Sequence, residues 1–213
     1  MKTDDLISML STGAEPIDPK RVARRYLLAI SGGSLAALAL MATVLKLNPA
    51  LPQELSEPMF WVRETFCASL GVVGVVGIAR LARPGRPLGL IPVGVALPVI
   101  AMWALAAAIL LTAPAPSRAH LIFGRTARVC PFLIAMIATP TFFALVWALR
   151  GLAPTRLRLT GGTAGFAAGS IGALVYSLHC PELTAPFIGI WYLLGITICA
   201  TLGVWAGPRL LRW

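Results

Sequence analysis

The chain has 213 residues, of which 58% are hydrophobic and only 12% charged, and it carries a formal net charge of +10. Soluble globular proteins contain about 25% charged residues and about 45–50% apolar ones. The composition therefore excludes a soluble domain, a disordered chain and a nucleic-acid-binding module. It indicates an all-α, polytopic integral membrane protein.

Six stretches without charged residues predict transmembrane helices, each of which needs about 20 apolar residues. The second is the least regular, because Arg63 and Glu64 lie at its start and residues 60–62 extend it upstream. No Asp, Glu, Lys or Arg lies in the interior of these predicted spans, which argues against an ion- or proton-coupled transporter. The six stretches are 26–45, 65–79, 87–117, 129–149, 159–181 and 183–208.

The distribution of Lys and Arg predicts the orientation, because these residues prefer the cytoplasmic side of a membrane. If the N-terminus is cytoplasmic, most of the 18 Lys and Arg residues fall on that side. We therefore expect cytoplasmic N- and C-termini, a cytoplasmic segment over residues 1–25 and a six-helix membrane domain over residues 26–213. The basic residues that remain outside are Lys46, Arg63, Arg118, Arg125 and Arg128.

A short amphipathic helix is predicted near the N-terminus. Thr3 can cap it, and acidic residues in its first turn suit the helix dipole. A helix of this length is marginal in water by itself. Two interpretations remain: a disordered tail, or a helix that folds when it docks into the groove of a partner. The residues of this candidate binding element are Thr3, Asp4, Asp5, Leu6, Ile7 and Leu10.

Two of the four cysteines are candidates for chemistry. Cys130 opens the fourth predicted span and Cys180 closes the fifth, so the predicted topology puts both at the outer face. Two thiols at one face can form a disulfide in an oxidising compartment, capture a soft metal ion or act as a simple thiol switch. Arg128, and His179 when protonated, would favour the thiolate form. The alternative is a pair of unconnected interfacial cysteines.

The other two cysteines and the glycines are best explained by packing. Cys67 and Cys199 lie inside predicted spans. Gly161, Gly165 and Gly169 recur every four residues, a spacing that lets helix backbones approach closely, either within one chain or between two chains. The sequence contains no C-x-x-C motif, no plausible Ser-His-Asp set and no carboxylate pair for acid–base work, so we expect neither an enzyme nor a cofactor.

Two segments are distinctive: MKTDDLI at residues 1–7, and HCPE at 179–182, followed by APF at 185–187 and WY at 191–192. With the six predicted spans, they resemble the NrsF-type membrane anti-sigma factors, negative regulators of extracytoplasmic-function sigma factors. The resemblance covers essentially the whole chain. It implies a multi-pass protein of the bacterial inner membrane that keeps a sigma factor from RNA polymerase.

The resemblance also implies roles for particular residues. The N-terminal segment would dock the sigma factor, and Cys130 and Cys180 would sense oxidative or heavy-metal stress. Membrane lipid would be the other partner, nucleic acid would not be bound directly, and a homo-oligomer stays open. A small permease is the alternative from another class, and a membrane redox enzyme is a third.

Overall fold

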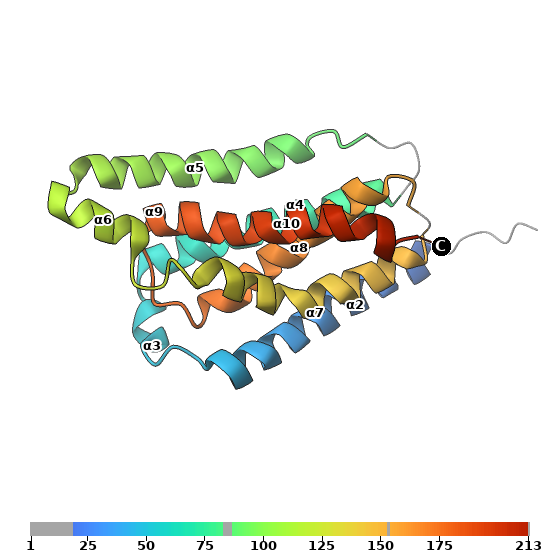
Figure 1. Cartoon of the computed structure of the whole chain (residues 1–213), viewed down its shortest axis with the longest axis horizontal. Coiled ribbons are helices and arrows are strands. Elements are labelled where there is room, and N and C mark those ends of the chain that lie inside the picture. Colours follow the sequence, from blue (N-terminus) through green and yellow to red (C-terminus); the bar gives the residue numbers. More distant parts are fainter. Residues whose placement is uncertain (1–18, 83–86, 153, 213) are drawn as a thin grey trace, which may run out of the picture.

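A computed structural model describes residues 19–82, 87–152 and 154–212, and every regular element within them is helical (Figure 1). This confirms the predicted all-α class. The predicted N-terminal helix, with Thr3 to Leu10, lies outside the described residues. The elements are α2 (Pro19–Leu40) continuing as the π-helix η1 (Met41–Leu45), α3 (Leu51–Glu54), α4 (Pro58–Leu81), α5 (Ile91–Thr112), α6 (Ala115–Phe123), α7 (Cys130–Arg150), α8 (Leu157–Ser177), α9 (Ala185–Phe187) continuing through the π-helix η2 (Ile188–Tyr192) into α10 (Leu193–Leu210).

Five helical stretches are long and apolar enough to cross a membrane, and they correspond to five of the predicted spans. The remaining predicted span, α8, has 21 residues but carries many glycines and hydroxyl groups, which make it less apolar. It therefore stays a predicted span. The five stretches are Val22–Leu45, Pro58–Leu81, Ile91–Thr112, Cys130–Arg150 and Ala185–Leu210.

The second span begins earlier than the charge pattern suggested. Pro58 occupies the first turn of α4, where a proline costs no helical hydrogen bond, so the helix already includes Arg63 and Glu64. The Arg63 side chain is fully buried. The prediction that no charged residue lies inside a span was therefore wrong.

α8 is the central helix and packs against α10, α4 and α7. Its approach to α10 is so close that a methyl group on Gly161 or Gly165 would overlap a backbone carbonyl of α10. In the reverse direction, a methyl group on Gly203 would overlap the carbonyl of Gly161. The glycine face of α8, which the sequence left open between two kinds of packing, thus packs within the chain.

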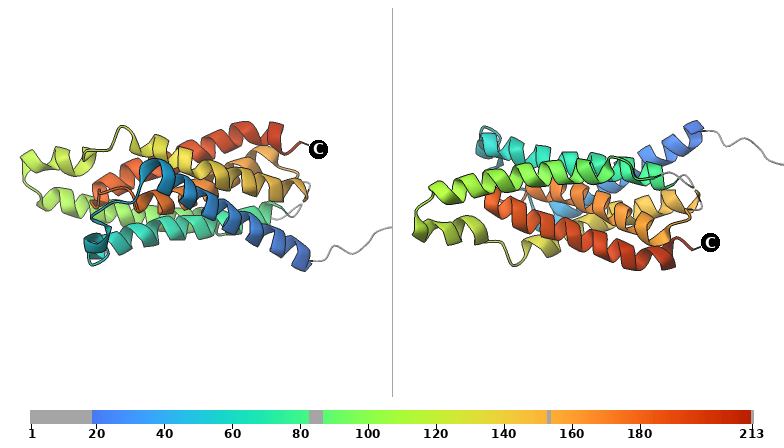
Figure 2. Two further views of the ribbon diagram at one scale, coloured as in Figure 1. Left: turned by 90° about the horizontal axis from the view of Figure 1, so that it is seen from below. Right: turned by 90° about the horizontal axis from the view of Figure 1, so that it is seen from above.

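α2 and α5 lie on opposite sides of this core (Figure 1). α2 crosses α7, where Gly33 of α2 packs against Thr141 of α7. The first turns of α2 extend away from the other helices (Figure 2). α5 contacts α4, α9 and η2, and Trp103 donates a hydrogen bond from its indole nitrogen to the carbonyl of Gly189 at 2.9 Å.

The two ends of the bundle differ. The short helices α3, α6 and α9 lie at one end, which we call the α3 end (Figure 1). The start of α2 and the end of α10 lie at the other, which we call the opposite end. The α3 end holds the candidate site.

Candidate functional site

The structure brings Cys130 and Cys180 together at the α3 end. Cys130 is the first residue of α7, and Cys180 lies in the segment between α8 and α9. Both thiols are free, both lie in the same buried cluster of side chains, and the Cys130 thiol lowers the pKa of Cys180. Neither side chain has exposed surface, so both thiols are buried inside the bundle at this end. A thiol packs like a small apolar group, which makes this burial inexpensive.

Two tyrosines are buried in the same cluster as the two thiols. Tyr176 on α8 and Tyr192 on η2 have ring centroids 5.8 Å apart. The Thr126 hydroxyl oxygen lies 3.9 Å from the Cys180 sulfur. A few polar side chains therefore accompany the thiols in an otherwise apolar core.

The pKa of Cys180 lies below that of an ordinary thiol. The largest cause is the interaction with the Cys130 thiol, which outweighs the opposing effect of burial. The backbone N–H of Glu182, the Tyr192 hydroxyl and the positive charge of Arg63 lower this pKa further. Cys180 is thus the thiol of the pair that ionises first, and the thiolate is the nucleophilic form of cysteine.

Arg63 is the functional residue that sequence reasoning missed. Its Nη1 donates to the carbonyls of Cys180 at 3.0 Å and Glu182 at 3.1 Å, and its Nη2 donates to the carbonyl of Ser177 at 3.0 Å. One guanidinium on α4 therefore holds three backbone carbonyls around Cys180. The sequence offered one indication that Arg63 has a role. Arg63 lies at the start of a predicted span and within ten residues of two acidic residues, Glu54 and Glu57.

Arg63, rather than the cations expected from the sequence, provides the positive charge at the site. Arg128 is exposed on the surface. The His179 ring interacts through Nδ1 with the carbonyl of Lys46 at 2.9 Å. Neither residue contributes to the lowered pKa of Cys180. The prediction was wrong because both residues are neighbours of the cysteines in sequence, whereas Arg63 reaches Cys180 from another helix.

The segment around Cys180 is also bonded to its neighbours on both sides. The backbone N–H of Asn48, which follows the end of α2, donates to the carbonyl of Leu178 at 3.0 Å. A carboxylate oxygen of Glu182 accepts a hydrogen bond from the backbone N–H of Arg125 at 2.7 Å. Residues 177–182 therefore connect α4, the end of α2 and the loop before α7.

The described residues contain no group of three or more His, Cys, Asp or Glu side chains arranged to hold a metal ion. A soft metal ion would thus have only two thiol ligands at this site. Cys67 and Cys199 are buried in α4 and α10, and Cys199 packs against Gly169 of α8, which agrees with the packing roles predicted for them.

Fold and site together define the class: a helical bundle whose apolar helices suit a membrane and whose buried polar site is a thiol pair held by an arginine. A sequence model of the family described as NrsF, negative regulator of sigma F, matches residues 10–213. The chain belongs to this family.

Two relatives match along their whole length. The chain is 46% identical over 213 residues to the probable anti-sigma-F factor NrsF of Azospira oryzae, covering all of both proteins. It is 39% identical over 221 residues to the anti-sigma-F factor NrsF of Caulobacter vibrioides, again covering all of both. No solved structure matches the chain.

Proposed function

We propose that this protein is a membrane anti-sigma factor that holds an extracytoplasmic-function sigma factor on its N-terminal segment and releases it when Cys130 and Cys180 react. The observation that carries the proposal is the full-length similarity to two proteins named as anti-sigma-F factors. The sensing role is supported by the two free thiols buried in one cluster at the α3 end and by the effect of the Cys130 thiol on the pKa of Cys180.

The proposed setting is the bacterial inner membrane, with α8 as the sixth span and both termini in the cytoplasm. Arginines concentrated at the opposite end support this orientation, because basic residues favour the cytoplasmic side. The α3 end, with the thiol pair, would then face the periplasm. The arginines that support the orientation lie on α2, α4, α7, α8 and α10 or directly before α8, and they are Arg24, Arg25, Arg80, Arg150, Arg156, Arg158 and Arg209.

The chemical step that we propose is formation of a disulfide by a peroxide. The Cys180 thiolate attacks one peroxide oxygen, which becomes a sulfenic acid on Cys180 while hydroxide leaves and takes up a proton. The Cys130 thiol then attacks the same sulfur and displaces water. In total, the two thiols lose two electrons and two protons, and one hydrogen peroxide becomes two water molecules.

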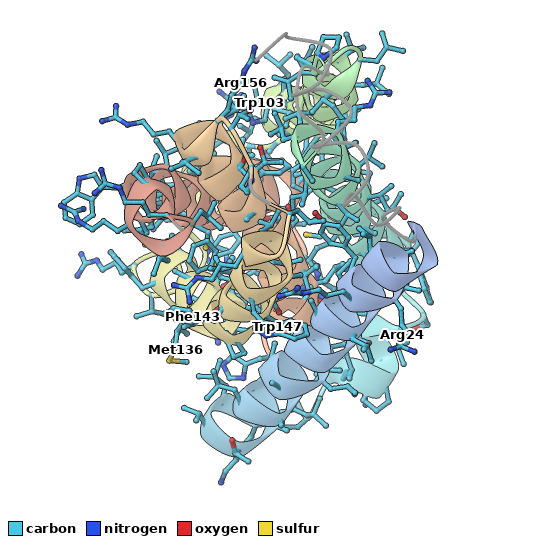
Figure 3. The ribbon with its side chains drawn as sticks, turned by 90° about the vertical axis from the view of Figure 1, so that its right-hand side faces the viewer. Arg24, Trp103, Met136, Phe143, Trp147 and Arg156 are labelled. Carbon is cyan, nitrogen blue, oxygen red and sulfur yellow. The ribbon has the colours of Figure 1, made fainter. Side chains whose placement is uncertain are left out.

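α7 provides a route from this step to the sigma factor. It begins with Cys130 at the α3 end and carries Trp147 near the opposite end. Trp147 lies against α2 (Figure 3), and Arg25 of α2 contacts it. Residues 1–18 precede α2 directly in the chain. A shift of α7 would therefore be felt at the base of the proposed docking segment.

The first experiment is co-purification from the native host. The tagged full-length protein and a variant lacking residues 1–25 are extracted in mild detergent under reducing conditions, and bound proteins are identified by mass spectrometry. We expect a sigma factor with the full-length protein and none with the variant. If the full-length protein retains no sigma factor, the proposal is wrong, and solute flux in vesicles would test a small permease instead.

The second experiment addresses sensing. Without peroxide, the Cys130→Ser and Cys180→Ser variants should bind the sigma factor like the wild type. After treatment with hydrogen peroxide, each variant should keep the sigma factor bound, whereas the wild type should release it. Cys199→Ser, which removes a buried thiol on α10, is the matched control and should still release it. Full release from the Cys130→Ser, Cys180→Ser double variant would rule out the sensing role.

A further inference from the structure

Arg63 carries a charge that the fold has to compensate. Its side chain is fully buried, and burying an unpaired cation is strongly unfavourable. The charge must therefore be balanced by groups nearby. Arg63 on α4 reaches the carbonyl of the neighbouring Cys180, whose thiol is buried with Cys130 on α7, Tyr176 on α8 and Tyr192 on η2. The Thr126 hydroxyl in the loop before α7 lies 3.9 Å from the Cys180 sulfur.

Two carboxylates lie near Arg63, but neither forms a tight ion pair with it. The Glu54 Oε2 atom is 3.8 Å from Nη2, and the Glu64 Oε1 atom is 3.4 Å from Nε. Both carboxylate atoms and Nε lack a hydrogen-bond partner in the described part of the chain. The strong hydrogen bonds of Arg63 go instead to neutral carbonyls. Arg63 is therefore anchored chiefly by the backbone around Cys180, with the two carboxylates at longer distances.

The guanidinium of Arg63 is held beside Cys180. The carbonyl of Cys180 is itself bound to Nη1, so the guanidinium is fixed next to the residue that ionises. An arginine suits this position because its planar fork reaches several acceptors at once, whereas a lysine presents a single point charge.

We propose that Arg63 is the positioning residue of the thiol site: it holds residues 177–182 in place, its charge favours the thiolate of Cys180, and Glu54 on α3 moderates that charge. The purpose assigned to the thiolate, sensing, rests on the proposed function. The effect on thiol chemistry does not, and it can be measured in the isolated protein.

The test compares two variants that should act in opposite directions. The rate of Cys130–Cys180 disulfide formation by hydrogen peroxide is measured as a function of pH in detergent-solubilised full-length protein, with the linked peptides quantified by mass spectrometry. Arg63→Gln should move the midpoint of this pH profile upward by about one pH unit. Below the midpoint, the disulfide should therefore form about tenfold more slowly than in the wild type. Glu54→Gln should move it downward, because the moderating charge is lost while Oε1 still accepts from Asn48.

The opposite signs separate charge from damage to the fold, since general loosening would change both variants alike. Arg63→Lys, which keeps the charge, should have a midpoint closer to the wild type than Arg63→Gln. Arg118→Gln is the control, because Arg118 is an exposed arginine that bonds only locally, to the carbonyl of Ala113. Its profile should match the wild type.

The proposal fails if the Arg63→Gln midpoint stays at the wild-type value, or if both the Arg63 and Glu54 variants move it in the same direction. These outcomes are independent of the sigma factor. A protein that shows opposite shifts in detergent but no thiol-dependent release in cells would overturn the sensing role and leave the role of Arg63 intact.

Discussion

Arg25 of α2 is joined to Trp147 of α7 in two ways. Its Nη2 donates to the Trp147 carbonyl at 2.6 Å, and its guanidinium carbon lies 4.5 Å from the centroid of the indole ring. The helix that follows the N-terminal segment is thereby fastened to the end of the helix that starts with Cys130. A cation over an indole ring stabilises such a contact by about 0.5–2 kcal/mol.

Trp147→Leu tests this contact. We expect the variant to form the Cys130–Cys180 disulfide at the wild-type rate but to release less sigma factor after peroxide treatment, because the ring that couples α7 to α2 is missing. The measurement is co-purification in parallel with quantification of the disulfide. Trp205→Leu is the control: Arg209 lies 5.0 Å from the centroid of this exposed indole ring on α10, and loss of the ring should leave release unchanged. Undiminished release from Trp147→Leu would contradict the coupling.

The packing of α8 on α10 predicts a sharp difference between two glycines. Gly165→Ala would place a methyl group on the carbonyl of Cys199, and overpacking of this kind costs about 1–3 kcal/mol. Gly32→Ala on α2 meets nothing within 4 Å and should stabilise by up to about 1 kcal/mol through helix propensity. Melting of the purified protein in detergent should therefore occur at a lower temperature for the first variant and not for the second. Equal melting temperatures would show that the helices can separate freely.

The lowered pKa of Cys180 predicts how its reactivity depends on pH. Alkylation of Cys180 by iodoacetamide requires the thiolate, so its rate should rise with pH through a midpoint below the value of about 8.5 that is usual for cysteine. Because the Cys130 thiol is the largest cause of the lowered pKa, Cys130→Ala should move this midpoint upward. Mass spectrometry of the Cys180 peptide gives the rate. A midpoint that is unchanged in Cys130→Ala would show that the two thiols do not interact.

The sequence was sufficient to predict helices and to place Cys130 and Cys180 at the same end, because hydropathy and the alternation of spans determine both. It left open whether the two thiols meet. It was insufficient for Arg63. A charged residue at a predicted helix start can be exposed at the membrane surface or buried with groups that compensate its charge. The partners of Arg63 are backbone carbonyls more than 110 residues away, from Ser177 to Glu182, and no side-chain pattern reveals them.

The central position of α8 was equally hidden. Its glycines indicated close packing but not against which surface, and α10 supplies that surface with Gly203 and Gly207. The orientation of the thiols toward the interior also depends on packing rather than on position along the chain. Neighbours in sequence, such as His179 and Arg128, were therefore poor guides to the electrostatics of Cys180.

The backbone contact between α8 and α10 limits which parts of the protein can move. No side chain lies between Gly161 or Gly165 and the facing carbonyls of α10. Sliding or rotation of either helix would therefore cause a clash, and α8 and α10 form one rigid unit. Residues 177–182 follow at the end of α8, and Arg63 donates hydrogen bonds to three of their carbonyls. We therefore expect a change at Cys180 to displace α7, together with the α2 helix that contacts it, while α8 and α10 keep their positions relative to each other.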